Sequence, residues 1–371
     1  MRYYIIAGEA SGDLHGANLM TAIRSCDPQA EFRFWGGDRM AAVGGTPVRH
    51  IKDTAVMGFV EVVSHLGQVT DNLRFCKKDL LEYAPDVLVC IDYPGFNLKI
   101  AKFAHQHGIP VCHYISPQIW AWKKGRIKAM RRDIDQLCYI LPFEQDFYAK
   151  NHFPQASFVG HPLIDEVAKY QGQQESKSDK PIIALLPGSR RQEVERVLPR
   201  MAELASRHPE YHFRVAAMSL LGEDFYRGVL SGCRPSNLDC QIDNTYGILS
   251  EAYAAVVCSG TATLEAALFH VPQIVCYRAN AVSIAVARVL LSIKYISLVN
   301  LIADAPVVKE LIQHDMNIRT LDHEFSNICV NASERERISE GYRKVENLLG
   351  NEGASLRTAQ IIVSCARRQT T

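Results

Sequence analysis

Asp92 combines a chemically useful side chain with a position typical of catalytic residues. It follows residues 86–91, D-V-L-V-C-I, a mostly apolar run that predicts a buried strand, and it precedes Y-P-G-F-N. A carboxylate at the carboxyl end of such a strand lies where open α/β sheets bind ligands, and apolar surroundings raise its pKa toward that of a general base. The alternative is that Asp92 caps a helix beginning near Asn97, although Asn97 is itself a suitable cap. We predict that Asp92 is the catalytic base.

A glycine-rich segment, G-E-A-S-G-D at residues 8–13, joins the first expected strand to an amphipathic helix. Glycines at such a turn let a ligand approach the backbone closely, and the free N–H groups of a helix start attract anions. The segment matches neither the dinucleotide fingerprint nor the P-loop. A structural turn and a ligand loop are both consistent with it, and the second interpretation assigns substrate contacts to Gly8, Glu9, Ser11 and Gly12.

A similar turn, P-G-S-R-R, follows the apolar run at residues 182–186 and precedes another helical pattern. Gly188 and Ser189 place backbone donors at the helix start, and Arg190 adds a planar bidentate donor, a combination that suits a diphosphate. The alternative is a capped turn whose arginines are only solvated.

A third loop of small residues, S-G-T-A-T at residues 259–263, opens the helical pattern that contains L-E-A-A-L. It brings Gly260 and Thr261 to the helix start and Glu265 into the second turn. A carboxylate in that position can accept hydrogen bonds from both hydroxyls of a ribose. Glu265 alternatively complements the helix dipole. Three such loops at strand ends favour a bound ligand over helix capping alone.

A dense basic cluster follows two tryptophans, in W-A-W-K-K-G-R-I-K-A-M-R-R at residues 120–132. Amphipathic tryptophans beside cations are typical of a membrane-interface or phosphate-binding patch, and a solvated helix face is the alternative. The apolar residues 56–63 are a second candidate for lipid contact or for the core. The interface interpretation assigns the lipid patch to Trp120, Trp122, Lys123, Lys124, Arg126 and Lys128.

Metal ligands are not expected. Asp133 and Asp135 spell D-x-D, a string found in metal-dependent glycosyltransferases, but they directly precede an expected strand, and we interpret the match as coincidence. His105, His107 and His161 have no metal-ligand spacing and are interpreted as structural. We therefore predict no metal and no cofactor.

Composition and charge set limits on the function. The chain has 371 residues, of which 47% are hydrophobic and 22% charged, the balance of a globular protein that is large enough for two domains. A net charge of +1 gives no general attraction to nucleic acid. The 11 cysteines are scattered without a C-x-x-C pair, as expected in a reducing cytoplasm. We expect no signal peptide, because the first apolar run is too short, and no membrane-spanning segment, because no run approaches roughly 20 apolar residues.

Apolar runs alternate with helical patterns twice along the chain, which predicts two doubly wound α/β domains with parallel sheets. Residues 1–168 form the expected N-terminal Rossmann-like domain, and residues 181–332 form the C-terminal one. A polar stretch at residues 170–180 is the expected linker. We expect the two domains to face a cleft, and residues 333–371 to form helices that pack on the N-terminal domain or on a partner subunit.

Nine motifs occur in an order that resembles the lipid-A-disaccharide synthases. They run from the first strand to Leu301 and are together far more specific than any one of them. The motifs are G-E-A-S-G-D, A-V-M-G-F-V-E-V, I-D-Y-P-G-F-N, Y-I-S-P-Q-I-W-A-W, L-P-F-E, F-V-G-H-P, L-L-P-G-S-R, S-G-T-A-T-L-E and S-L-V-N-L.

The resemblance implies a GT-B-type inverting transferase that moves a sugar from UDP-2,3-diacylglucosamine to 2,3-diacylglucosamine 1-phosphate, in a β-1,6 linkage, and releases UDP. By motif, the family's catalytic aspartate falls on Asp92, its diphosphate-binding arginine on Arg190, and its nucleotide contacts on or near Gly260, Thr261, Glu265 and Asn300. Some relatives have a second aspartate three residues after the first, where this chain has Gly95. A paired-carboxylate mechanism is therefore disfavoured, and no metal is required.

The implied substrates carry acyl chains, so we expect an enzyme that associates peripherally with an anionic membrane surface on its cytoplasmic side, with homodimer formation through the C-terminal helices. Two alternatives remain on sequence grounds. One is a UDP-N-acetylglucosamine 2-epimerase of similar fold, and the other is a UDP-sugar or lipid-binding module without catalysis.

Overall fold

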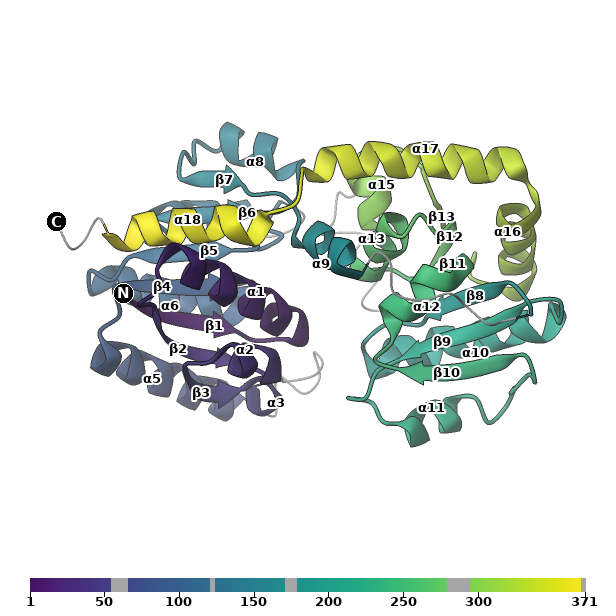
Figure 1. Cartoon of the computed structure of the whole chain (residues 1–371), viewed down its shortest axis with the longest axis horizontal. Helices are drawn as coiled ribbons and strands as arrows, with labels where there is room; N and C mark the ends of the chain where they lie inside the picture. Colours follow the sequence, from purple (N-terminus) through teal and green to yellow (C-terminus); the bar gives the residue numbers. More distant parts are fainter. Residues whose placement is uncertain (55–65, 121–123, 171–178, 279–293, 368–371) are drawn as a thin grey trace. The chain divides into compact units, whose positions relative to one another are not determined.

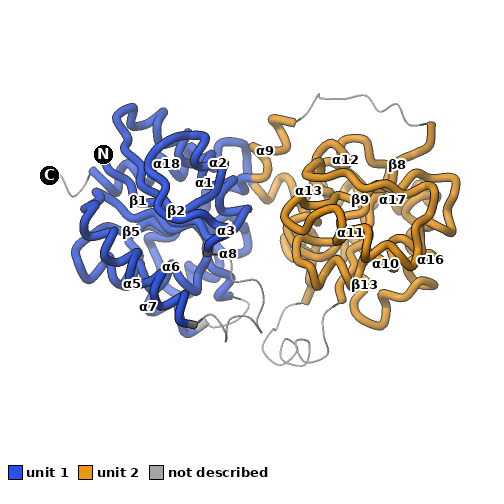
Figure 2. The backbone as a smooth tube through the Cα atoms, turned by 90° about the horizontal axis from the view of Figure 1, so that it is seen from below, with its two compact units in different colours: residues 1–162, 350–371 blue, residues 163–349 orange. Residues whose placement is uncertain are grey.

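The computed structural model describes residues 1–54, 66–120, 124–170, 179–278 and 294–367, and it divides into two compact units (Figures 1 and 2). Unit 1 comprises residues 1–162 and 350–371, and unit 2 comprises residues 163–349. Each unit contains one parallel β-sheet covered by helices on both faces. None of the described helices has the length and apolar character needed to span a membrane.

Unit 1 is built on a seven-stranded sheet with the order β3-β2-β1-β4-β5-β6-β7. Its elements are β1 Arg2–Ala7, α1 Ala10–Cys26, β2 Glu31–Gly36, α2 Asp38–Val43, β3 Thr46–His50, α3 Ile51–Thr54, α5 Leu66–Tyr83, β4 Val87–Ile91, α6 Pro94–Gln106, β5 Val111–Tyr114, the 3₁₀ helix η1 Lys124–Arg126, α7 Ile127–Asp133, β6 Gln136–Tyr139, α8 Glu144–Lys150, β7 Ala156–Phe158 and α18 Ala354–Arg367. The strand order reverses beside β1 and β4, and ligands of doubly wound folds bind at such a switch point.

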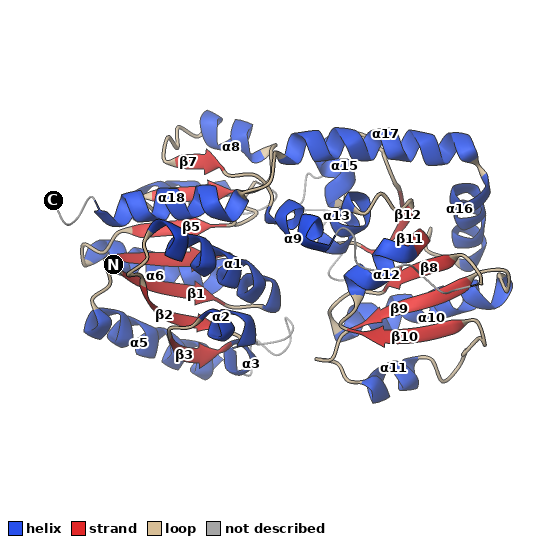
Figure 3. Cartoon of the chain, in the orientation of Figure 1, coloured by secondary structure: helices blue, strands red, loops and turns tan. Residues whose placement is uncertain are grey.

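Alternate residues of the central strands pack on opposite faces of this sheet. Tyr4 and Ile6 of β1 join a buried cluster with side chains of α5, α6 and α7, among them Leu80 and Ile100. On the other face, α18 packs against α1 and against β4, β5 and β6 (Figures 1 and 3). Because β4 is buried on both faces, its sequence V-L-V-C-I is a continuous apolar run.

Unit 2 is built on a six-stranded sheet with the order β10-β9-β8-β11-β12-β13. Its elements are α9 Pro162–Tyr170, β8 Ile182–Leu186, α10 Arg191–Arg207, β9 His212–Ala217, α11 Glu223–Val229, β10 Leu238–Ile242, α12 Thr245–Glu251, β11 Ala252–Cys258, α13 Thr261–Leu268, β12 Gln273–Tyr277, α15 Leu298–Ala303, β13 Lys309–Ile312, α16 Ile318–Val330 and α17 Ala332–Leu349. The sheet is again parallel throughout, with β8 and β11 at its centre.

The unit boundaries differ from the domain limits expected from sequence. The first boundary lies at residue 162 rather than 168, because α9 packs within unit 2, where Tyr170 meets the rings of Tyr246 and Phe269 edge-on. Residues 333–371 contain helices, as expected, but the two described helices belong to different units. α17 belongs to unit 2, where the Tyr342 hydroxyl donates to the Val271 carbonyl oxygen at 3.0 Å, and α18 belongs to unit 1.

Candidate active site

Three loops meet at the carboxyl edge of the unit 1 sheet. Ala7 of β1 is paired with Ile91 of β4, and Ile91 is paired with Tyr114 of β5. Because parallel strands end at the same edge, the segments that follow these positions are neighbours. They begin with Gly8, Asp92 and Ile115. The predicted catalytic aspartate therefore lies between the glycine-rich loop and the loop after β5.

The backbone at Asp92 has an unusual conformation. Asp92 and Tyr93 both have positive φ angles, of 45° and 48°, a left-handed conformation that costs about 1–3 kcal/mol per non-glycine residue. Asn97, which is fully buried, supports the turn by donating its side-chain amide to the carbonyl oxygens of Asp92 at 2.8 Å and Ile91 at 3.2 Å. The helix begins at Pro94, with Tyr93 as its N-cap, so the alternative in which Asp92 caps a helix starting near Asn97 does not hold.

Asp92 has the electrostatic setting of a base. Burial, and secondarily the charge of Glu9, raises the pKa of Asp92 to about 6, although the side chain keeps partial contact with solvent. A carboxyl group with that pKa is mostly ionised at neutral pH and is a stronger proton acceptor than an ordinary aspartate. The second carboxylate near Asp92 thus comes from the glycine-rich loop, since position 95 is glycine.

The glycine-rich loop serves both as a structural turn and as an exposed surface. A Cβ atom on Gly8 would lie 2.3 Å from Cγ of Tyr93, so only glycine fits there. Asp13 is buried and accepts hydrogen bonds from the backbone N–H groups of Gly37 at 2.6 Å and Met40 at 3.1 Å, which fixes α2. Glu9 and Ser11 are exposed and remain accessible to a substrate.

In unit 2, two glycine loops follow the paired central strands β8 and β11. Gly188 has a φ angle of +105° and Gly260 one of +146°, both suited to glycine. Arg190 is the N-cap of α10. Its side chain is 76% exposed and lies 3.5 Å from the Glu193 carboxylate, measured from Nη1 to Oε1. The first turns of α10 and α13 therefore place backbone N–H groups beside an accessible guanidinium, an arrangement that suits a diphosphate.

Glu265 lies on α13, one turn beyond Gly260. Burial raises its pKa to about 7, and the hydroxyl of Tyr246 donates to its Oε1 at 3.3 Å and opposes that rise. The carboxyl group is partly exposed. A carboxyl group held in this way can, once it is ionised, accept hydrogen bonds from the paired hydroxyls of a ribose.

Asn300 does not offer its side chain to a ligand. It is 1% exposed. Its amide nitrogen donates to the Val308 carbonyl oxygen and to Glu310 Oε1, each at 2.9 Å, and its amide oxygen accepts from the Val308 N–H at 2.9 Å. The nucleotide contact that the resemblance places on or near Asn300 stays a prediction, for the backbone or the neighbouring residues rather than for this side chain. Asn300 instead fixes the chain between α15 and β13.

The basic cluster is only partly described. Trp122 and Lys123 lie outside the described residues, as do the side chain of Lys124 and the apolar residues 56–63. Trp120 is half-buried and packs edge-on against Phe143 with 4.8 Å between ring centroids, whereas Lys128 is exposed. The expected lipid patch therefore has one tryptophan that is anchored to the fold and at least one cation that is free to meet a surface.

The D-x-D string has structural partners on both sides. Asp133 is buried and accepts from Arg132 Nε at 2.6 Å, and Asp135 accepts the N–H of Val111 at 2.8 Å. Within the described part of the chain, no group of three His, Cys, Asp or Glu side chains has the arrangement of a metal site.

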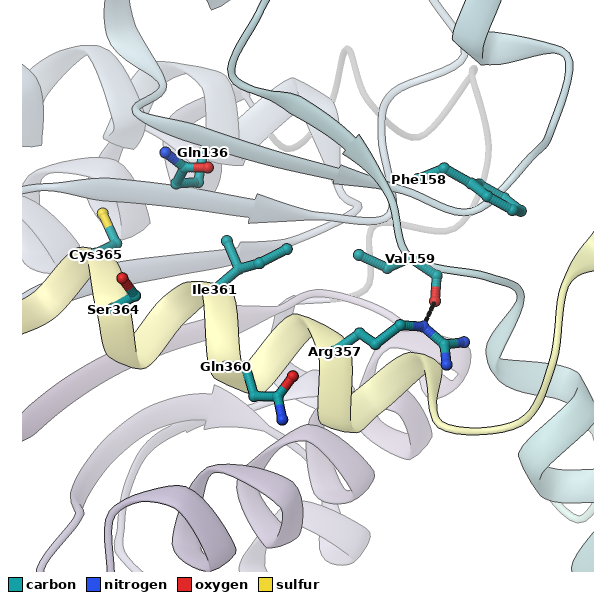
Figure 4. Close-up of a pocket in the computed structure, with 8 residues that line it drawn as sticks. All are labelled: Gln136, Phe158, Val159, Arg357, Gln360, Ile361, Ser364 and Cys365. Atoms are coloured by element: carbon teal, nitrogen blue, oxygen red, sulfur yellow. Dashed lines mark hydrogen bonds between the residues drawn. The ribbon is translucent and has the colours of Figure 1, made fainter.

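A pocket of about 430 Å³ opens between α18 and the strands β6 and β7 (Figure 4). Arg357 lines it and donates from Nε to the Val159 carbonyl oxygen at 2.8 Å, and Ile361 and Cys365 project into it from the same helix. Its lining, drawn from described residues, includes none of the predicted site residues, so the pocket is separate from the loops around Asp92.

One buried acid received no role from the sequence. Glu144 is 1% exposed and lies in the first turn of α8, near the loop that follows β5. Its only signal in the sequence is the motif L-P-F-E, in which nothing distinguishes a buried acid from a helix-capping one.

Comparison with known proteins gives consistent relationships along nearly the whole chain. The family model described as lipid-A-disaccharide synthetase matches residues 3–363. The lipid-A-disaccharide synthase of Trichlorobacter lovleyi is 37% identical, with 98% of this chain and 97% of the relative covered. The corresponding synthase of Geobacter sulfurreducens is 34% identical over 99% and 98% of the two chains.

Solved structures with a similar fold are much more distant in sequence. A UDP-GlcNAc 2-epimerase from Neisseria meningitidis has a TM-score of 0.70 at 12% identity. The match covers 99% of this chain and 100% of the epimerase. MurG from Acinetobacter baumannii has a TM-score of 0.59 at 14% identity, with 98% and 99% covered. These likenesses show the fold, whereas the family match extends over nearly all of the sequence. The chain, with its two Rossmann-like units of the GT-B type, therefore belongs to the lipid-A-disaccharide synthase family of UDP-sugar-dependent glycosyltransferases.

Proposed function

We propose that this chain joins UDP-2,3-diacylglucosamine to 2,3-diacylglucosamine 1-phosphate in a β-1,6 linkage, giving the disaccharide 1-phosphate and UDP. The observation that carries the proposal, beyond family membership, is the partly buried Asp92 at the carboxyl edge of the unit 1 sheet, with its pKa raised to about 6. The likeness to 2-epimerases is one of fold alone, at 12% identity for the Neisseria enzyme, and does not favour that activity.

In the proposed reaction, the 6-hydroxyl oxygen of the acceptor attacks the anomeric carbon of the donor sugar. The bond between that carbon and the UDP oxygen breaks with inversion, and the acceptor proton passes to Asp92. Arg190 and the N–H groups at the starts of α10 and α13 stabilise the charge that develops on UDP. Unit 1 would thus activate the acceptor and unit 2 bind the nucleotide, through Gly188, Ser189, Arg190, Gly260, Thr261 and Glu265.

We further propose that no metal or cofactor takes part, since these cationic and backbone donors supply the positive charge that a metal would otherwise provide. The acylated substrates place the enzyme at the surface of an anionic membrane, on its cytoplasmic side, as a peripheral protein. The exposed Lys128 and the half-buried Trp120 support that location. Pairing of two chains through the C-terminal helices remains part of the proposal.

The test is a turnover assay with purified protein and both acylated substrates, in which UDP and the disaccharide are detected together. Asp92→Asn is the matched variant. It should lower turnover by on the order of 10² to 10⁴ because the general base is lost. UDP binding, measured by calorimetry, should stay intact because its proposed contacts are in unit 2. Wild-type turnover should persist in EDTA.

Three results would contradict the proposal. Near-wild-type turnover by Asp92→Asn would show that Asp92 is not the general base. Loss of activity in EDTA that Mg²⁺ restores would show that the mechanism requires a metal. UDP binding without any disaccharide formation by the wild type would favour a binding module.

A further inference from the structure

Glu144 is a buried acid that connects two loops of unit 1. The Ser116 hydroxyl donates to its Oε1 in a short hydrogen bond, and the backbone N–H of Leu141 donates to its Oε2 at 3.2 Å. Ser116 belongs to the loop after β5, and Leu141 to the loop after β6. Ser116 is itself 5% exposed. The carboxyl group therefore joins two neighbouring strand ends from the inside of the fold.

The loop after β5 lies directly beside the predicted base. The N–H of Asp92 donates to the carbonyl oxygen of Tyr114 at 3.0 Å, and the N–H of Ile115 donates to that of Cys138 at 3.0 Å. Ile115 has a φ angle of 62°, which is unfavourable for a β-branched residue. The start of this loop is held in a strained conformation next to Asp92, and such a conformation persists only where surrounding contacts support it.

Trp120 lies further along the same loop. Its ring packs edge-on against Phe143, the residue before Glu144. Its indole N–H makes no hydrogen bond of standard geometry, but it lies near enough to favour the ionised form of Glu144. Glu144 and Phe143 therefore contact the loop at both Ser116 and Trp120, and residues 115–120 are held between these two points.

The charge state of Glu144 follows from its surroundings. Burial is the largest effect and raises its pKa to about 8, the donors from Ser116, Leu141 and Trp120 oppose the rise, and the charge of Asp92 adds to it. Tyr139 on β6 and Tyr148 on α8 are the other titratable groups that face it. Within the described part of the chain no cation forms an ion pair with it. At neutral pH the group is therefore mostly a neutral acid, which keeps its hydrogen bonds to the Ser116 hydroxyl and to the Leu141 N–H.

We propose that Glu144 is a positioning residue for the acceptor side of the reaction: from inside the fold it holds residues 115–120 against the strand end at which Asp92 lies. The inference rests on the proposed function of Asp92. A side chain that is 1% exposed does not touch the acceptor, so its effect passes through Ser116 and the loop. If Glu144 ionises, the buried charge lowers the stability of the fold. A side chain with a purely hydrophobic packing role would not show this effect.

Thermal melting tests the buried acid without any substrate. Glu144→Gln can keep hydrogen bonds to both Ser116 and Leu141, but it cannot ionise. The folded-state pKa of about 8 exceeds the ordinary value of 4.5, so the wild type loses stability as the pH rises between about 5 and 8. The melting temperature of Glu144→Gln should therefore gain on that of the wild type across this range, by at least about 2–4 °C. Asp146→Asn, at an exposed acid in the same turn, is the control and should show no such gain.

Kinetics test the positioning role. Glu144→Ala and Ser116→Ala should each reduce kcat/KM for the acceptor, by on the order of 10-fold for Glu144→Ala, while the affinity for UDP stays unchanged. Glu144→Gln should retain most of the activity near pH 7.

Each contrary result has a distinct meaning. A constant melting difference between Glu144→Gln and wild type across pH would show that the acid does not titrate in the fold as argued. Wild-type kinetics of Glu144→Ala would remove the positioning role, and equal inactivity of Glu144→Gln and Glu144→Ala would point to the carboxyl group in the chemistry itself. If the wild type makes no disaccharide, the proposed function fails, whereas the melting result still decides the state of Glu144.

Discussion

Glu9 and Asp92 follow paired positions on neighbouring strands, and the charge of one raises the pKa of the other. Ala7 of β1 is paired with Ile91 of β4, so the two acids come two residues and one residue beyond that pair. Glu9 is the second contribution to the raised pKa of Asp92, after burial. The resemblance directed attention to position 95 for a second carboxylate. The structure places one at this edge from a segment more than 80 residues earlier in the chain.

Replacing Glu9 should therefore move the acid limb of the pH–activity profile. Activity requires ionised Asp92, so kcat/KM should fall as the pH drops through about 6. Glu9→Gln removes a negative charge, lowers the pKa of Asp92 and shifts that limb to lower pH. Glu9→Asp retains the charge and serves as the control. A limb that stays in place in Glu9→Gln would show that the two acids do not interact in the working enzyme.

The central strands of both sheets could be predicted from sequence, and the edge strands could not. Nine apolar runs predict strands and correspond to β1, β2, β4, β5, β6, β8, β9, β11 and β12. They are residues 3–7, 31–35, 86–91, 110–115, 136–141, 182–186, 211–217, 255–258 and 272–277. The four strands without such a signal are β3, β7, β10 and β13, and all four are terminal in their sheets. An edge strand is paired on one side and partly exposed, as in T-P-V-R-H of β3, so its sequence lacks a continuous apolar run.

The site was predictable where one residue type at a strand end carries the signal. Asp92 and the glycines at positions 188 and 260 are of this kind, and the structure places them at strand ends as expected. Their functional roles remain predictions. The roles of Asn300 and Glu144 depend on which groups make hydrogen bonds with their side chains, and those groups come from other segments of the chain. A local pattern contains no information on such contacts.

The Tyr246 hydroxyl should tune nucleotide binding through Glu265. Tyr246→Phe removes the donor that lowers the pKa of Glu265, so a larger fraction of that group is protonated near pH 7. UDP affinity should fall at pH 7, by roughly fivefold for one lost hydrogen bond, and recover toward the wild-type value at pH 9. Calorimetry with UDP measures this.

The control for the ribose contact is 2′-deoxy-UDP. It should bind more weakly than UDP to the wild type but not to Glu265→Gln. If Glu265→Gln binds UDP normally, the ribose contact is wrong. If Glu265→Gln binds UDP more weakly but Tyr246→Phe binds it normally, the Tyr246 hydroxyl has no role in the ribose contact.

Arg190 should contribute a charged, bidentate contact to the diphosphate. Arg190→Ala removes it, and UDP affinity should fall by on the order of 10- to 100-fold, the range for hydrogen bonds to charged groups. Arg190→Lys keeps the charge without the planar fork and should recover only part of the loss. Uridine, which has no phosphates, should bind all three proteins equally. An equal loss for uridine and UDP in Arg190→Ala would instead indicate that the loop itself is disturbed.

Membrane binding must account for substrates that do not leave the bilayer. At ~0.8 kcal/mol per CH₂, two acyl chains of about a dozen carbons hold a sugar in the membrane by on the order of 20 kcal/mol. Under the proposed function, the enzyme therefore has to meet its substrates at the lipid surface. A net charge of +1 provides little attraction, so a local cluster has to supply it. Residues 120–132 hold the densest one in the sequence.

Removing the cluster should weaken binding to anionic vesicles. Each cation near the surface contributes ~1 kcal/mol, so the association is reversible and sensitive to salt. The variant replaces by serine four cations of the cluster: Lys123, Lys124, Arg126 and Lys128. The control replaces by serine four exposed cations of unit 2: Arg227, Arg234, Arg319 and Arg343. Sedimentation with phosphatidylglycerol vesicles at low salt should fall for the cluster variant and not for the control variant, and added salt should lower the sedimentation of the wild type.

Some binding should persist in salt because Trp120 flanks the cluster. Equal sedimentation of both variants and the wild type would mean that the cluster is a solvated face and that apolar residues alone dock the enzyme.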